Sequence, residues 1–379
     1  MAEWQRLANT TIARYTKGVE DELTSKKLWL KVLKKKGRIE YGVDNISGDG
    51  MKWDVPYRVI PLNTNNGEGQ ITPRRQDYVK QATLDYIGYD MADLMTERER
   101  IKNASGPGQI VGYFKKMVER QTTDTRERFA GELYVDSSGS GNSERLSGIE
   151  TMMATAGTVN ITSGATRTAN AADVVGYPSD TYAALSTVLA NYSGSWGTQS
   201  SIATTWPAGT GDLGYDFYSP TIVCYNSTAW GGADNTWDSN CVKAVRYLLT
   251  HLQRCYDAES DMVVVLMDRD LHRRYKDKLD SKERVEISSN TGLRKFGFNG
   301  AIQQDGAELM WDYYCTGGIG YAFNFDKMTL YSAYDNLFRV KGPTWEERES
   351  AYHVISRYFG QMKFQAPRYF GKLMTIAAD

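Results

Sequence analysis

The chain has 379 residues, of which 41% are hydrophobic and 24% are charged, and its formal net charge is −1. This length allows two hydrophobic cores, and the composition is ordinary for a soluble globular protein. A charge so close to neutral argues against the chain as a whole being a nucleic-acid-binding protein. The sequence contains no apolar run long enough for a membrane-spanning helix, so we expect no contact with a membrane.

The cysteines and the N-terminus indicate where such a chain is made. The four cysteines lack the spacing of metal ligands, and only three histidines occur. Residues 1–6 have no apolar core of the kind that a signal peptide carries. These features favour synthesis in a reduced, intracellular compartment.

Residues 1–36 form a basic segment, with nine Lys or Arg against four acidic residues. Its last basic residues are consecutive, namely Lys34, Lys35 and Lys36. The apolar positions follow a helix-like pattern that is too loose for a packed helix of a globular domain. The segment fits either a docking arm or a solvated amphipathic helix.

Residues 37–78 are dominated by extended runs and polar loops. Ile39 and Tyr41 fall on one face of a first run, and residues 44–50 are typical of a turn. A second run, residues 51–60, alternates apolar and polar side chains, and its Pro56 fits only an edge strand or a bulge. A two-stranded ribbon of this kind is marginally stable alone. We expect either a limb that reaches a neighbouring subunit or an ordinary hairpin that lies on its own domain.

A long helix is predicted next, beginning at Gly106-Pro107-Gly108 and running for about 28 residues, or roughly 40 Å. Its buried stripe is expected to consist of Ile110, Phe114, Met117, Val118, Gln121, Thr125, Phe129 and Leu133. The opposite face is heavily charged. That face must meet water, another subunit or a polyanion.

Residues 151–219 are rich in Ser, Thr, Ala and Gly and are interpreted as an ordered insertion, with one short helix over 182–192. A second domain follows, with helix and strand in alternation. Its predicted elements are a helix over 242–255, a buried strand over 262–267, a helix over 269–279, strands over 297–302 and 308–311, and a hairpin over 322–331. The extended, aromatic run 352–376 is expected to return the chain to the first domain. The fold class is therefore α+β.

Few residues suggest chemistry. Asp268 follows the buried strand, with His272 nearby, but we interpret Asp268 as a helix N-cap and His272 as a helix-surface residue. Asp234, Asp238 and Asn240 lack the spacing of a calcium loop. We expect no metal there.

Two glycine-rich stretches, residues 139–141 and 317–320, have neither the lysine of a phosphate loop nor dinucleotide-binding spacing. We interpret both as turns. The sequence thus predicts no catalytic residue, no cofactor and no enzyme activity, and it favours a structural role. A two-domain enzyme remains a remote alternative.

The order of these features resembles the major capsid proteins of tailed double-stranded DNA bacteriophages, which share the Hong Kong 97-like fold. The resemblance spans nearly the whole chain and is carried by short phrases that are each weak alone. They are Gly37-Arg38-Ile39, Trp53-Asp54-Val55-Pro56-Tyr57-Arg58, Glu132-Leu133-Tyr134-Val135-Asp136, Gly148-Ile149-Glu150, Tyr215-Asp216-Phe217-Tyr218-Ser219-Pro220, Leu266-Met267-Asp268-Arg269-Asp270-Leu271 and Ala366-Pro367-Arg368-Tyr369-Phe370-Gly371-Lys372.

The resemblance implies a domain organisation. Residues 1–36 would be the N-arm and residues 37–80 the region of the extended E-loop hairpin. Residues 81–150 and 345–379 would form the peripheral domain around the long spine helix. Residues 220–344 would form the axial domain, and residues 151–219 an insertion.

The resemblance also implies function and partners. The chain would assemble with itself into pentamers and hexamers of an icosahedral head, with a scaffolding protein, a portal and head-completion proteins. The head would enclose double-stranded DNA bound non-specifically, so the chain would reside in the virion after assembly in the host bacterial cytoplasm. Candidate inter-subunit contacts are Trp53, Val55, Tyr57, Arg58, Lys34, Lys35, Lys36, Arg126 and Arg128. An encapsulin-like nanocompartment shell, which encloses protein cargo, is the alternative.

Overall fold

The computed structural model describes only part of the chain, and every structural statement below concerns that part. The described residues are 27–42, 50–56, 79–102, 107–153, 175–176, 181–187, 218, 220–226, 230, 235–253, 262–280 and 302–375. The chain divides into two units. Unit 1 comprises residues 1–51, 85–148 and 328–363, and unit 2 comprises residues 52–84, 149–327 and 364–379. None of the described helices is both long and apolar enough to cross a membrane.

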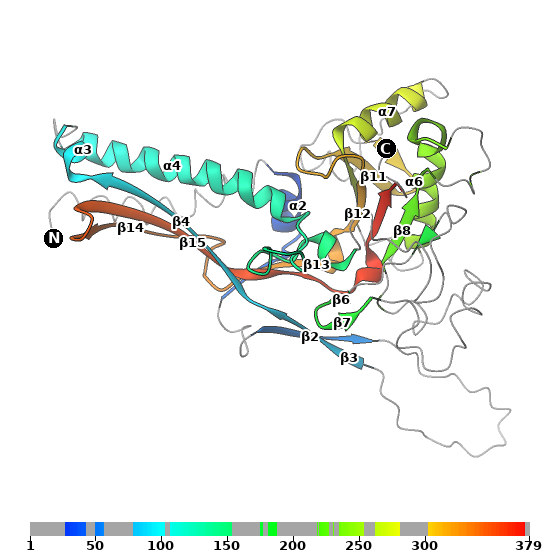
Figure 1. Ribbon diagram of the computed structural model, residues 1–379, viewed down its shortest axis with the longest axis horizontal. Coiled ribbons are helices and arrows are strands. Elements are labelled where there is room, and N and C mark those ends of the chain that lie inside the picture. Colours follow the sequence, from blue (N-terminus) through cyan, green and yellow to red (C-terminus); the bar gives the residue numbers. More distant parts are fainter. Residues whose placement is uncertain are drawn as a thin grey trace, which may run out of the picture. The chain divides into compact units, whose positions relative to one another are not determined.

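Unit 1 is built from a sheet and a long helix. Its helices are α2 (Leu28–Lys35), α3 (Glu97–Lys102) and α4 (Pro107–Glu132), and its strands are β1 (Ile39–Tyr41), β4 (Ile87–Thr96), β13 (Met328–Ser332), β14 (Arg339–Glu346) and β15 (Ala351–Phe364). The strand order is β1-β13-β15-β14, with β4 also paired to β15. β4 runs antiparallel to β15 along its whole length, and Figure 1 shows α4 lying along these two strands.

Helix α4 confirms the long helix expected from the sequence, with Pro107 at the first helical position, where its missing N–H costs nothing. The predicted stripe from Phe114 to Leu133 is buried. Two polar members of the stripe are satisfied by hydrogen bonds, since Gln121 Nε2 donates to the carbonyl of Val354 at 2.8 Å and Thr125 Oγ1 donates to the carbonyl of Gln121 at 2.7 Å. The amide of Gln121 therefore ties the middle of α4 to β15.

Helix α2 corrects the expectation that residues up to 36 are too loosely patterned to pack. Its apolar side chains, including Trp29 and Leu30, are fully buried. The Trp29 ring stacks on Phe129 of α4 with 5.8 Å between centroids, and Lys27 Nζ lies 2.8 Å from Glu127 Oε2. Five of the eight residues of α2 are buried, namely Leu28, Trp29, Leu30, Val32 and Leu33. Residues 27–36 thus belong to the core of unit 1, whereas the rest of the predicted arm lies outside the described residues.

Unit 2 contains the larger sheet, whose strand order is β10-β11-β9-β12-β16-β8-β5. These strands are β5 (Val175–Gly176), β8 (Thr221–Cys224), β9 (Val263–Met267), β10 (Ile302–Gln304), β11 (Ala307–Trp311), β12 (Gly320–Asn324) and β16 (Gly371–Met374). Parallel pairs join β11 to β9 and β16 to β8, and the other four neighbouring pairs of this sheet are antiparallel. The mixture of pairings confirms an α+β fold.

Two helices, α6 (Trp237–Gln253) and α7 (Arg269–Asp280), pack with this sheet around one apolar core. Every residue of β9 is buried, as its continuous apolar sequence predicted. The core joins Leu248 of α6, Tyr275 of α7 and Val265 of β9, all of which have no exposed surface. Short 3-10 helices complete the unit, namely η2 (Ile149–Met152), η4 (Phe325–Lys327) and η5 (Pro367–Tyr369).

The extended region 37–78 differs from the expected ribbon, in which the run with Ile39 and Tyr41 would pair with the run 51–60. Strand β1 does not pair with the next strand but runs parallel to β13, with Ile39 opposite Leu330. The two-stranded ribbon consists instead of β2 (Gly50–Pro56) and β3 (Val79–Asp85). Ile39 is buried in unit 1, so the apolar face of β1 packs within its own chain. A limb that reaches a neighbouring subunit would therefore begin after β1.

Three other expectations were wrong in whole or in part. Of the helix predicted over 182–192, the structure describes residues 182–187, and these belong to a hairpin of β6 (Thr181–Tyr182) and β7 (Leu185–Ser186), whose turn residues Ala183 and Ala184 have φ values of 51° and 63°. The hairpin predicted over 322–331 does not form, because β12 and β13 belong to different sheets on either side of η4. The run 352–376 returns the chain to the first domain as expected up to residue 363, where β15 pairs with β4 of unit 1, but β16 then joins the sheet of unit 2.

Candidate functional sites

The ribbon base is held by its own chain. Met51, Trp53 and Val55 alternate with exposed neighbours along β2, and all three are buried. The indole Nε1 of Trp53 donates to the carbonyl of Gln365 at 2.9 Å, and the ring lies 6.3 Å from that of Tyr182. This favours the alternative in which the base of the hairpin lies on its own domain. Two further contact candidates, Tyr57 and Arg58, lie outside the described residues.

The basic candidates differ in exposure. Lys34, Lys35 and Lys36 lie at the C-terminal end of α2, where positive charge stabilises the helix dipole, and Lys35 is the exposed one. Arg126 is only 8% exposed, with Nε 3.5 Å from Glu127 Oε1. Arg128 is exposed. Lys35 and Arg128 are thus the candidates most accessible to a neighbour or to phosphate.

A buried carboxylate fixes the loop that follows α4. Arg145 Nη2 donates to Glu132 Oε1 at 2.7 Å, and the Tyr89 hydroxyl donates to Glu132 Oε2 at 2.7 Å while accepting from the amide of Leu146 at 2.8 Å. Burial, followed by the hydrogen bond to Glu132, raises the pKa of Tyr89. The hydrogen bonds to Glu132 raise the pKa of Arg145. These contacts tie β4, α4 and the loop together, and Gly148 closes the loop because a Cβ there would crowd the backbone of Val135.

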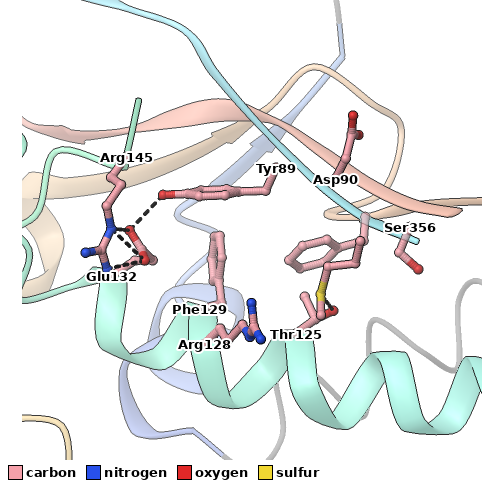
Figure 2. A pocket seen from close by; sticks show the side chains of 10 residues that line it. Tyr89, Asp90, Thr125, Arg128, Phe129, Glu132, Arg145 and Ser356 are labelled. Atoms are coloured by element: carbon pink, nitrogen blue, oxygen red, sulfur yellow. Dashed lines mark hydrogen bonds and ion pairs between the residues drawn. The ribbon is translucent and has the colours of Figure 1, made fainter. Parts of the chain in front are cut away.

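A cavity of about 500 Å³ opens beside this cluster, within unit 1 (Figure 2). Its apolar lining consists of Tyr89, Met91, Phe129 and Phe338, and its polar lining of Asp90, Thr125, Arg128, Glu132, Arg145 and Ser356. Figure 2 shows Phe129 projecting from α4 toward Tyr89, and the carboxylate of Asp90 pointing away from the helix. Sequence reasoning missed this site because its walls come from five separate segments of the chain.

Unit 2 contains a second buried charge cluster. Lys372 Nζ lies 2.6 Å from Glu150 Oε1, and the hydroxyl of Tyr321 donates to the same carboxylate. Lys372 is fully buried. Burial, followed by the charge of Glu150, raises the pKa of Tyr321 well above its ordinary value. The cluster joins η2, β12 and β16, so its role is to fix these elements.

Two of the residues considered for chemistry, Asp268 and Asp238, have structural partners. The Asp268 carboxylate accepts a hydrogen bond from the amide of Gly318 at 3.2 Å. His272 is not a surface residue as expected, since it is only 3% exposed, and burial lowers its pKa to about 4. Asp238 pairs with Arg274 at 2.7 Å. In the described ranges, no group of three or more His, Cys, Asp or Glu side chains is arranged to hold a metal ion.

Comparison with known proteins identifies the fold. No family model and no curated protein sequence matches the chain. Among solved structures, the capsid protein in the cyanophage A-1(L) capsid asymmetric unit is similar to it with a TM-score of 0.57, 14% sequence identity, and coverage of 90% of this chain and 91% of that one. The chain has the Hong Kong 97-like capsid fold.

Two other solved structures are similar to this chain with lower TM-scores. The capsid of the native GTA particle has a TM-score of 0.48 and 9% identity, covering 92% of this chain and 90% of that one. The mature capsid of bacteriophage PhiM1 also has a TM-score of 0.48 and 9% identity, covering 91% and 87%.

Proposed function

We propose that the chain is the major capsid protein of a tailed bacteriophage and self-assembles into the icosahedral head that encloses double-stranded DNA. The supporting observation is the similarity to the cyanophage capsid protein, which extends over about nine tenths of both chains. A similarity of that extent is larger than either unit alone, so it extends over parts of both. By analogy, unit 1 with α4 as its spine would be the peripheral domain, and the seven-stranded sheet of unit 2 would be the core of the axial domain.

The partners follow from this assignment. The chain would form pentamers and hexamers with copies of itself, and it would meet a scaffolding protein, a portal and head-completion proteins during assembly in the host cytoplasm. Contact with packaged DNA would be non-specific and sensitive to salt, through exposed cations such as Lys35 and Arg128. In the finished virion the subunit would act as structure and not as an enzyme.

The hairpin beyond β2 is the part of the ribbon that we infer to reach a neighbour. Its base is occupied by contacts to Gln365 and Tyr182, so Trp53 and Val55 would position the hairpin, whereas Tyr57 and Arg58 would be available for contact. Aromatic and arginine side chains supply much of the binding energy at protein interfaces. The sequence offers both immediately after Pro56.

Expression of the chain alone, followed by negative-stain electron microscopy, tests the proposal. We expect closed shells or ring-shaped capsomers. Replacement of residues 62–69 by a Gly-Ser segment of equal length should abolish them while the circular dichroism spectrum and solubility stay unchanged. Shells that contain protein cargo and exclude nucleic acid after assembly in the host would instead indicate a nanocompartment. A chain that remains monomeric under all assembly conditions would contradict both.

A further inference from the structure

The cavity beside α4 has the size of a ligand site, but most of the polar groups that line it are already hydrogen-bonded or ion-paired within the protein. Its volume of about 500 Å³ lies within the usual range for bound ligands. Thr125 donates to the carbonyl of Gln121, and Ser356 Oγ donates to Gln121 Oε1 at 2.9 Å. Glu132 and Arg145 neutralise each other. Most polar groups at the cavity are therefore already satisfied by the protein itself.

Arg128 is the exception among the described residues that line the cavity. It is exposed, and within the described part of the chain no carboxylate forms an ion pair with it. The remaining surface is supplied by aromatic rings and the Met91 side chain. A fitting ligand would bury an apolar side chain against Phe129 and Phe338 and offer a carboxylate to Arg128. This is the chemistry of a short peptide in which acidic and apolar residues adjoin.

The chain contains such a peptide close to the point where the described structure begins. Residues 19–23 read Val-Glu-Asp-Glu-Leu, with three acids between two apolar residues. They lie outside the described residues but are tethered to Lys27, which pairs with Glu127, the neighbour of Arg128 in α4. Two residues further on, Trp29 stacks on Phe129, a wall of the cavity. The four residues from Leu23 to Lys27 span up to roughly 14 Å, so a tether of this length raises the local concentration of the acidic peptide at the cavity.

We propose that the cavity between α4 and β4 binds residues 19–23 of the same chain, with Leu23 or Val19 against the aromatic floor and a carboxylate on Arg128. The inference concerns one subunit and goes beyond the assembly function, so it can fail while the capsid assignment stands, and the reverse also holds. It assigns a docking site to an acidic stretch within an otherwise basic N-terminal segment.

Disulfide trapping in the full chain tests the proposal. Leu23→Cys is combined with Met91→Cys, which lines the cavity, in a background with Cys255→Ser. The matched control pairs Leu23→Cys with Ala92→Cys, because Ala92 is the next residue of β4 and is exposed, with its side chain on the opposite face of the strand. At low protein concentration we expect an intramolecular disulfide with Met91→Cys to form at least tenfold faster than with Ala92→Cys. Equal rates would overturn the proposal, and a disulfide-linked dimer would assign the cavity to a second copy instead.

The charge contribution has its own control on the same helix. Arg128→Ala should slow trapping about two- to fivefold, as expected for a partly exposed ion pair, and added salt should act in the same direction. Arg120→Ala removes an equally charged side chain of α4 that is 78% exposed and already near Asp124, and it should leave the rate unchanged. If Arg128→Ala has no more effect than Arg120→Ala, the carboxylate contact is refuted.

Discussion

Truncation of Trp53 is expected to destabilise the free subunit before any effect on assembly. The side chain is 8% exposed and makes a hydrogen bond to Gln365 and a ring contact with Tyr182. Truncating a buried tryptophan to alanine typically costs about 3–5 kcal/mol. Trp53→Phe retains most of the ring contact but removes the indole donor, and it should cost about 1–2 kcal/mol because the carbonyl of Gln365 loses its partner.

Urea unfolding of unassembled subunits, followed by circular dichroism, measures both costs. Tyr313→Ala is a suitable control, because this aromatic side chain of the same unit is 74% exposed and should change the free energy of unfolding by no more than about 0.5 kcal/mol. An identical unfolding curve for Trp53→Ala and the unmodified chain would refute the reasoning. Trp53 would then not be held in the free subunit, and contact with a neighbour would again be its best explanation.

Three further predictions concern stability. Lys372→Met should lower the free energy of unfolding by about 3–5 kcal/mol, because it leaves Glu150 buried without its cation. Addition of Glu150→Leu should recover most of this loss, as measured by urea unfolding. A double variant that is as unstable as Lys372→Met alone would contradict the pairing. Folding lowers the pKa of His272 from 6.5 to about 4. As the pH is lowered, His272 is therefore protonated first in the unfolded chain, which stabilises the unfolded state. The free energy of unfolding should fall by roughly 3 kcal/mol between pH 6.5 and 4. His272→Leu should lack that part of the pH dependence, and stability curves that run parallel would exclude it. Gly360→Ala should lower the melting temperature sharply, since its Cβ would overlap the carbonyl oxygen of Tyr331, whereas Gly112→Ala in α4, where nothing lies within 4 Å, should be neutral or slightly stabilising.

The elements with a strong sequence period were predicted well. The stripe of α4 repeats every three or four residues over seven turns, and only one helical face can satisfy it. Strand β9 was equally clear, because five consecutive apolar residues after a helix fit a strand buried on both faces. In both cases the local pattern and the tertiary environment require the same conformation.

Strand pairing could not be predicted from the same patterns. The apolar alternation of β1 shows that one face is buried, but it does not show that Ile39 lies opposite Leu330, almost three hundred residues later. The same limit explains the wrong hairpin over 322–331, since the short helix η4 sends β12 and β13 into separate sheets. The predicted helix near 182 failed because two alanines adopt a left-handed turn, which their sequence gives no reason to expect.

The candidate sites were harder still to predict. Glu132 and Arg145 are thirteen residues apart, and no motif marks them as partners, yet together with Tyr89 they form one wall of the cavity. Only the packing of β4 on α4 brings the tyrosine to the carboxylate. A lysine as far along the chain as Lys372 is likewise matched to Glu150 by the sheet and not by the sequence.

Anchoring of the ribbon base changes how an assembly defect should be interpreted. A hairpin whose base is already ordered loses less conformational entropy when its outer part binds a neighbour, so Trp53 and Val55 would strengthen assembly without touching another subunit. Loss of shells in Trp53→Ala alone would therefore not identify a contact. Tyr57→Ala is the informative comparison, because a residue that acts only at an interface should reduce assembly while leaving the urea unfolding of the free subunit unchanged. If Trp53→Ala lowers both assembly and the stability of the free subunit, and Tyr57→Ala lowers only assembly, then the boundary between the anchoring and the contacting part of the hairpin lies at Pro56.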